Sequence, residues 1–190
     1  MWSVDAVAAD VFVGTPPFNP VPQQLVAIEI LVNVGAQTLG SYSATFEYDE
    51  TVVHIASISG GTSPAFSSAP ITDPGTFSSG ASPMAGVQSG TAAPSGFVSI
   101  ATVTLEAVGQ PSDSSLLTLT GVSLFSGSGA LLPATVFGSS VLIGSAPSVP
   151  ALPGVWWILL AAGLLGISLR EAALAGGRVS GSAEGSSKLG

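Results

Sequence analysis

The chain contains a single histidine, His54, and no cysteine, so few of its side chains have the chemistry of a nucleophile, a base or a soft metal ligand. A Ser–His–acid triad needs a histidine that is held by a carboxylate beside an activated serine. The residues around His54 alternate as in a strand, which favours a structural or solvent-facing imidazole, and no Gly-x-Ser-x-Gly turn precedes a helix. The absence of cysteine excludes disulfides and thiol catalysis. We therefore expect no catalytic residue.

Three carboxylates gather at Glu47, Asp49 and Glu50. Their oxygens are ligands of the kind that Ca²⁺ takes. A polar strand end followed by a tight turn explains the same residues, because a short aspartate side chain bonds its own backbone. The other acids show no pair at the separation that glycoside hydrolysis needs, and no glycine-rich loop is followed by lysine. We expect no metal, no cofactor and no enzyme activity.

The most informative spacing lies at residues 149–170, VPALPGVWWILLAAGLLGISLR. The unbroken apolar run at 154–169 would span roughly 24 Å as a helix, slightly less than the hydrocarbon core of about 30 Å. Its two tryptophans lie near its start, where indole rings favour the membrane–water boundary. We predict a transmembrane helix at 154–169, with a buried helix of a soluble domain as the alternative. The expected anchor residues are Trp156, Trp157, Leu160, Leu164, Leu169 and Arg170.

The distribution of charge orients this predicted helix. All three basic residues, Arg170, Arg178 and Lys188, follow the apolar run, whereas most of the acidic residues precede it. Cytoplasmic flanks of membrane helices carry the excess of lysine and arginine. We expect residues 170–190 to be a short cytoplasmic Gly/Ser-rich tail and the N-terminal part to lie outside. A nucleic-acid partner is excluded, because such a partner needs a basic face.

The order of a Val-Pro-x-x-Pro motif, a short apolar run and an arginine resembles the PEP-CTERM class of protein-sorting tails, particularly its VPLPA-like variants. The resemblance covers residues 149–170 and departs from the strict Pro-Glu-Pro form, since no acid stands between the two prolines. It implies an exosortase-type sorting enzyme and membrane lipid as partners, and delivery to the bacterial cell envelope or exterior. The implied sorting motif is Val149, Pro150, Ala151, Leu152 and Pro153.

The N-terminal residues 1–14 have neither the basic region nor the apolar region of a signal peptide, and they already have the pattern of a strand. We expect an export signal to precede Met1. A cytosolic domain with a C-terminal anchor is the alternative, against which the charge asymmetry argues.

Short alternating runs, separated by turn residues, recur throughout residues 1–144. The clearest are residues 24–34 and residues 39–48. One face of the second run consists of Tyr42, Ala44, Phe46 and Tyr48. Further strands are expected at 7–13, 51–59, 97–108, 116–125 and 136–143, with weak strands at 71–72 and 76–81 inside the Ser/Gly/Pro-rich stretch 60–96. No helical period appears before Gly154, which predicts an all-β antiparallel sandwich of eight or nine strands, followed by a Pro/Ser linker at 145–153.

The succession of these strands is similar to the cohesin domain, a nine-stranded jelly-roll sandwich related to carbohydrate-binding modules. The residues that carry the resemblance are Phe46, Tyr48, Asp49, Val53, Ile58 and Gly60, together with the ranges 96–105 and 117–124. The likeness extends over roughly residues 7–143 and consists of a hydrophobic pattern. It implies a cohesin-like jelly-roll of about nine strands that binds another protein.

Two functions remain open at this point. The first is an exported module for protein–protein interaction at the cell surface, with an unknown surface protein as partner. The second is a carbohydrate-binding or extracellular-matrix structural domain that binds a polysaccharide, in which exposed aromatic rings would stack on sugars. The aromatic residues considered for contact with a partner or a sugar are Tyr42, Phe66 and Phe77.

Overall fold

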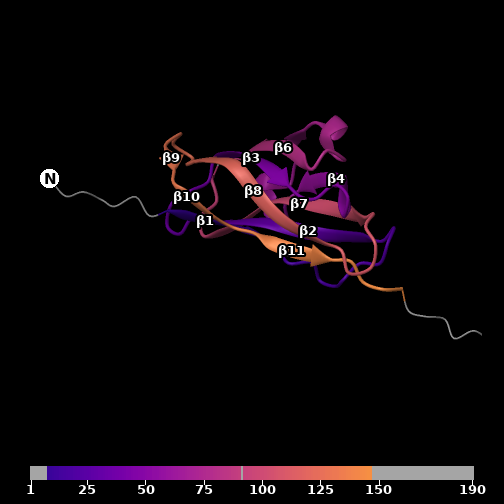
Figure 1. Cartoon of the computed structure of the whole chain (residues 1–190). Coiled ribbons are helices and arrows are strands. Elements are labelled where there is room, and N and C mark those ends of the chain that lie inside the picture. Colours follow the sequence, from indigo (N-terminus) through magenta and orange to yellow (C-terminus); the bar gives the residue numbers. More distant parts are fainter. Residues whose placement is uncertain (1–7, 91, 147–190) are drawn as a thin grey trace, which may run out of the picture. The chain divides into compact units, whose positions relative to one another are not determined.

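The computed structural model describes residues 8–90 and 92–146, whose strands form two sheets that pack face to face (Figure 1). The first sheet has the strand order β10-β1-β2-β7-β4, and the second has the order β11-β8-β3-β6-β5, with β9 paired to β8. The first sheet comprises Ala134–Phe137 (β10), Ala9–Val13 (β1), Leu25–Asn33 (β2), Phe97–Ala107 (β7) and Val53–Gly60 (β4). The second comprises Ser139–Leu142 (β11), Ser114–Phe125 (β8), Ser41–Glu47 (β3), Ala81–Val87 (β6), Ile71–Thr72 (β5) and Leu131–Leu132 (β9).

The alternation of apolar residues explains why these strands bury one face each. On β2 every second residue is buried, and β3 follows the same rule. The buried side chains of the two strands are Val26, Ile28, Ile30, Val32, Tyr42, Ala44 and Phe46. They meet between the sheets in one hydrophobic cluster, because successive side chains of a strand point to opposite faces. The predicted all-β sandwich is confirmed.

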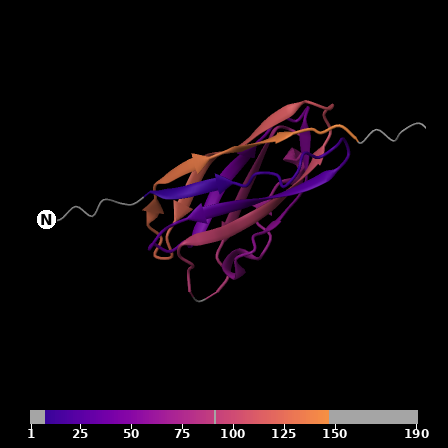
Figure 2. The ribbon, with the colours of Figure 1, turned by 90° about the horizontal axis from the view of Figure 1, so that it is seen from below.

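The last strands of the sandwich differ from the prediction. The expected single strand at 136–143 is two strands, because the chain crosses from one sheet to the other at Gly138. A Cβ there would lie 2.8 Å from the carbonyl oxygen of Leu117, so only glycine fits this crossing. β10 pairs with β1 in parallel, unlike the other strand pairs of the described residues, and the orange and indigo strands lie side by side in Figure 2. Beyond the crossing, the hydroxyl of Ser139 donates to the carbonyl oxygen of Gly14 at 2.8 Å.

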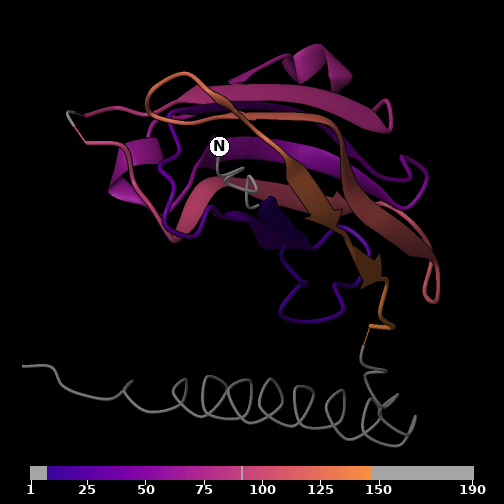
Figure 3. The ribbon, with the colours of Figure 1, turned by 90° about the vertical axis from the view of Figure 1, so that its left-hand side faces the viewer.

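The stretch 60–96 is more ordered than its composition suggests. β5 lies at the predicted residues 71–72, but the weak strand expected at 76–81 is a turn that follows a 3-10 helix, η2 (Pro74–Thr76). The side chain of Asp73 caps that helix by accepting from the amide of Gly75 at 2.9 Å. A second 3-10 helix, η1 (Pro64–Phe66), precedes β5. In Figure 3 these turns are the short coils and loops drawn in purple to magenta beside the strands.

The predicted linker and sorting motif from residue 147 onward, the helix at 154–169 and the tail at 170–190 lie outside the described residues. Within residues 8–90 and 92–146, no helix has the length and apolar character needed to cross a bilayer.

Candidate functional site

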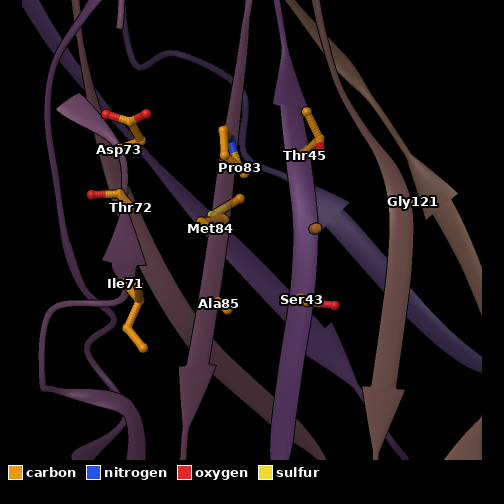
Figure 4. A pocket seen from close by; sticks show the side chains of 10 residues that line it. Ser43, Thr45, Ile71, Thr72, Asp73, Pro83, Met84, Ala85 and Gly121 are labelled. Carbon is orange, nitrogen blue, oxygen red and sulfur yellow. The ribbon is translucent and has the colours of Figure 1, made fainter. Parts of the chain in front are cut away.

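A shallow groove with a volume of about 410 Å³ crosses the outer face of the second sheet. Figure 4 shows the residues of β5, β6, β3 and β8 that line it, in that spatial order. Ile71 and Asp73 stand at one side of the groove, and Gly121 of β8 stands at the other. The groove therefore runs across four strands that are far apart in the sequence.

The floor of the groove is flat because its outward side chains are small. Ser43 of β3 lies opposite Ala85 of β6, and Thr45 lies opposite Pro83. Their neighbours along the strands point into the core, since Ala44 and Met84 are buried. A floor built from hydroxyl and methyl groups offers a partner little to hold by itself, but it lets another backbone come close.

Exposed apolar side chains border part of this floor. Ile71, which lines the groove, is 78% exposed, and Val87, two residues beyond Ala85 on β6, is 70% exposed. Val87 and Phe125 both lie opposite Ser41, on its two neighbouring strands. Exposed apolar side chains that group on one face are typical of interaction surfaces.

The charge on this face is acidic. The hydroxyl of Thr120 donates to the carboxylate of Glu47 at 2.6 Å, which fixes that carboxylate at the end of the sheet. A second hollow of about 330 Å³ adjoins it and is lined by Glu47, Tyr48 and Asp49 together with the start of β8. Asp49 accepts from the amide and the hydroxyl of Thr51, and these bonds hold the pKa of Asp49 below its ordinary value. The turn predicted at Asp49 is therefore present, and the hydrogen bonds from Thr51 to the Asp49 carboxylate hold it.

The described residues show no arrangement suited to catalysis or to a metal. His54 lies on β4, opposite Glu106 of β7, in the first sheet and away from the groove. Within residues 8–90 and 92–146, no group of three His, Cys, Asp or Glu side chains is placed to hold a metal ion.

The aromatic residues named as contacts lie elsewhere than expected. Tyr42 is 4% exposed and Phe66 is 2% exposed, and their rings pack against each other with centroids 5.7 Å apart. Phe77 is half-buried against the core. Tyr42 points inward because it shares the buried face of β3 with Phe46. A ring buried in this way presents no face to a sugar or to a partner.

Sequence reasoning did not single out the residues that line the groove. The predicted apolar face of residues 39–48 leaves Ser43 and Thr45 on the opposite, outward face, where the structure has them, but hydroxyl side chains on a strand carry no signal of binding. The strand β6 lies inside a stretch of serine, glycine, alanine and proline, which are weak strand formers. Ile71 was the one available signal, since an isolated apolar residue in a polar stretch is conspicuous.

Comparison with known proteins finds the same fold. The structure is similar to a cohesin module from a Clostridium perfringens family 33 glycoside hydrolase, with a TM-score of 0.61, 13% identity and coverage of 73% of this chain and 98% of that one. A type I cohesin–dockerin complex from Clostridium thermocellum matches with a TM-score of 0.60 and 14% identity, and the match covers 77% of this chain and 100% of that one. A non-cellulosomal cohesin from the archaeon Archaeoglobus fulgidus matches with a TM-score of 0.59 and 16% identity, and the match covers 73% of this chain and 93% of that one. At these identities the likeness establishes the fold alone. No protein-family model and no curated protein matches the chain.

Proposed function

We propose that residues 8–146 form a non-catalytic module that binds another protein through the outer face of the second sheet. The observation that carries this proposal is the groove over β5, β6, β3 and β8, with its floor of small side chains and its apolar surround. A flat floor lets a partner's helix or strand approach the sheet, and the surrounding apolar residues supply the area that stabilises the contact.

The cohesin-like fold supports the same proposal. Among the similar structures, one from Clostridium thermocellum is a cohesin bound to a dockerin. Another, from Archaeoglobus fulgidus, is described as non-cellulosomal, so the fold also occurs outside cellulose-degrading assemblies. We propose that the partner of this chain is a protein, which the following experiment identifies.

The experiment places a bulky charge in the groove. Ala85→Arg fills the floor beside Ser43, and the matched control Ala27→Arg places the same side chain on the exposed outer face of the first sheet. Partners of the full chain are cross-linked in its own cells, identified by mass spectrometry, purified and titrated against both variants. We expect Ala85→Arg to weaken binding by about tenfold or more, as for a substitution at the centre of an interface, and Ala27→Arg to bind like the wild type. If the partner bound the two variants with equal affinity, the groove would not be its binding site.

We further propose that the chain is exported and carried to the cell envelope. The support is the sequence at 149–170 with its Val-Pro-x-x-Pro motif, its apolar run and Arg170, read by an exosortase-type enzyme. Replacing Pro150 and Pro153 together by alanine leaves the apolar run untouched. We expect this variant to stay in the inner membrane while the wild type reaches the surface. Identical distribution of both proteins would leave the prolines only the role of a stiff spacer.

A further inference from the structure

The outer face of the first sheet carries a row of three phenylalanines, Phe137, Phe12 and Phe97, which we call the phenylalanine ridge. Phe12 of β1 lies directly opposite Phe137 of β10, and the two rings are stacked with centroids 5.1 Å apart and planes 14° apart. On its other side the ring of Phe12 meets Phe97 of β7, with centroids 6.2 Å apart. Phe97 is 67% exposed and Phe137 is 47% exposed. The ridge thus crosses from β10 to β7 above β2.

The core of the sandwich does not include this ridge, because the buried cluster between the sheets contains none of its three rings. Phe12 and Phe137 form a cross-strand aromatic pair, which contributes to the stability of the sheet, but Phe97 and Phe137 remain exposed. Aromatic residues are the type most enriched where proteins meet. The position of the ridge, on the sheet opposite the groove, separates it from the proposed binding surface described above.

The contacts among the rings reduce the open aromatic face that a sugar would need. Pyranose rings bind by lying flat on an aromatic face, but the rings of Phe12 and Phe137 are stacked on each other, and Phe97 lies tilted beside Phe12. Phe97 and Phe137 are the exposed rings, one at each end of the ridge. Such a row fits into a cleft, and its two end faces suit planar cations, which favour the face of an aromatic ring.

Charge narrows the choice of partner. Between residues 8 and 146 the chain has neither lysine nor arginine, so its charged side chains besides His54 are all carboxylates. Two of them lie on the same face on either side of the ridge. Asp10 stands two residues before Phe12 on β1, and Glu29 stands two residues before Leu31, the partner of Phe12 on β2. The carboxylate of Glu29 is held in place by the hydroxyls of Ser99 and Thr62. A second copy of the chain would bring carboxylates against carboxylates.

We propose that the phenylalanine ridge docks into an apolar cleft of a partner protein whose rim carries arginine and lysine side chains. The apolar cleft covers the ring edges, the cations at its rim stack on the end faces of Phe97 and Phe137, and Asp10 and Glu29 pair with them. The module then has two interaction surfaces on opposite sheets and can hold two proteins at once.

The test uses the full 190-residue chain, labelled with ¹⁵N and held in a non-ionic detergent that accommodates its apolar run. The probe is the peptide acetyl-Arg-Leu-Leu-Arg-amide, which places cations on both sides of an apolar pair. The matched peptide has glutamate in place of arginine. We expect saturable shifts of the backbone amides of Phe12, Leu31, Phe97 and Phe137 with the arginine peptide, and none with the glutamate peptide.

We expect the replacement of both Phe97 and Phe137 by serine to lower the affinity for the arginine peptide about threefold to fivefold, as for the loss of exposed cation–aromatic contacts. The control Leu131→Ser removes an apolar residue that is 65% exposed elsewhere and should change nothing. Circular dichroism checks that all variants are folded, which we expect because each change is at the surface.

Four results overturn the proposal. One is equal shifts with both peptides, and another is shifts spread over all acidic residues. A third is movement of the ridge amides with protein concentration alone, which would identify a second copy as the occupant. The fourth is the absence of any shift.

Discussion

Tyr42 joins the two sheets through a single hydrogen bond, and its removal has a calculable cost. Its hydroxyl donates to the carbonyl oxygen of Ile100 at 3.1 Å in the buried interior. Ile100 is the extra residue of a bulge in β7, since Ala101 pairs with Ile30 and Ser99 pairs with Leu31. Tyr42→Phe keeps the ring and leaves the carbonyl oxygen buried without this donor. A buried acceptor left unpaired costs about 1–3 kcal/mol, which for a domain of this size lowers the melting temperature by roughly 3–10 °C.

Urea denaturation followed by circular dichroism measures this cost on a chain that ends at Gly144. The matched control is Tyr48→Phe, whose hydroxyl donates to the carbonyl oxygen of Phe77 at 2.7 Å. That bond is only partly buried, so water replaces the lost donor and the cost should stay below about 1 kcal/mol. A Tyr42→Phe variant as stable as the wild type, or no more affected than Tyr48→Phe, would refute the argument that this bond ties the sheets together.

Two further predictions rest on the structure and a third on the sequence alone. In Gly86→Ala the new Cβ would lie 2.5 Å from Cε1 of Tyr42, so we expect overpacking to cost about 1–3 kcal/mol in the same denaturation assay. The hydroxyl of Ser99 holds the pKa of Glu29 below its ordinary value. The contribution of this carboxylate is therefore present above its unfolded pKa and is lost as the pH falls through its folded pKa, so Glu29→Gln should flatten acid unfolding curves in that window. Leu160→Arg, in the predicted span, should release the protein from membranes, because a charge at a helix centre costs about 2.5–3.5 kcal/mol on insertion scales; continued pelleting would place the anchor elsewhere.

The sequence predicted the regular strands of the sandwich well, because strict alternation of apolar and polar residues indicates a strand with one buried face. Alternation could not show which way each side chain points where the pattern breaks. In β7, which lies where a strand was predicted, Ile100 and Ala101 are consecutive and both buried, which simple alternation does not predict. The bulge at Ile100 resets the face of the strand. A similar irregularity in β4, between Ile55 and Ser57, produced the mixed pattern around His54.

The strand β6 could not be found from local preference. Most of its residues are weak strand formers, and they include Pro83, which lies opposite Thr45 of β3. Proline is tolerated there because β5 is only two residues long and pairs with Met84 and Ala85, so Pro83 lies beyond its end. Tertiary pairing with β3 creates this strand, and with it half of the groove floor.

The phenylalanine ridge was open to prediction only in part. The inward positions of Val11 and Val13 place Phe12 on the outside of β1, which alternation alone indicates. The register that brings Phe12 beside Phe137 depends on a parallel pairing between the two ends of the domain, and no local pattern encodes it. The aromatic residues predicted as contacts lie elsewhere, because Tyr42 and Phe66 are buried and Phe77 packs against the core.

A bulge at Gly121 of β8 determines which side chains of this strand face the core and which face the groove. Two residues of β8 stand opposite Ala44, where the register with β3 shifts, and Gly121 takes a left-handed φ of +58° there. Without the extra residue, Leu119 and Leu124 would point to opposite faces, since they are five positions apart; with it, both are buried. The same shift sends Phe125 outward to the edge of the groove. An added Cβ at Gly121 meets no atom within 4 Å, so the requirement for glycine comes from its backbone conformation. The apolar surround of the groove thus depends on the same bulge that completes the core.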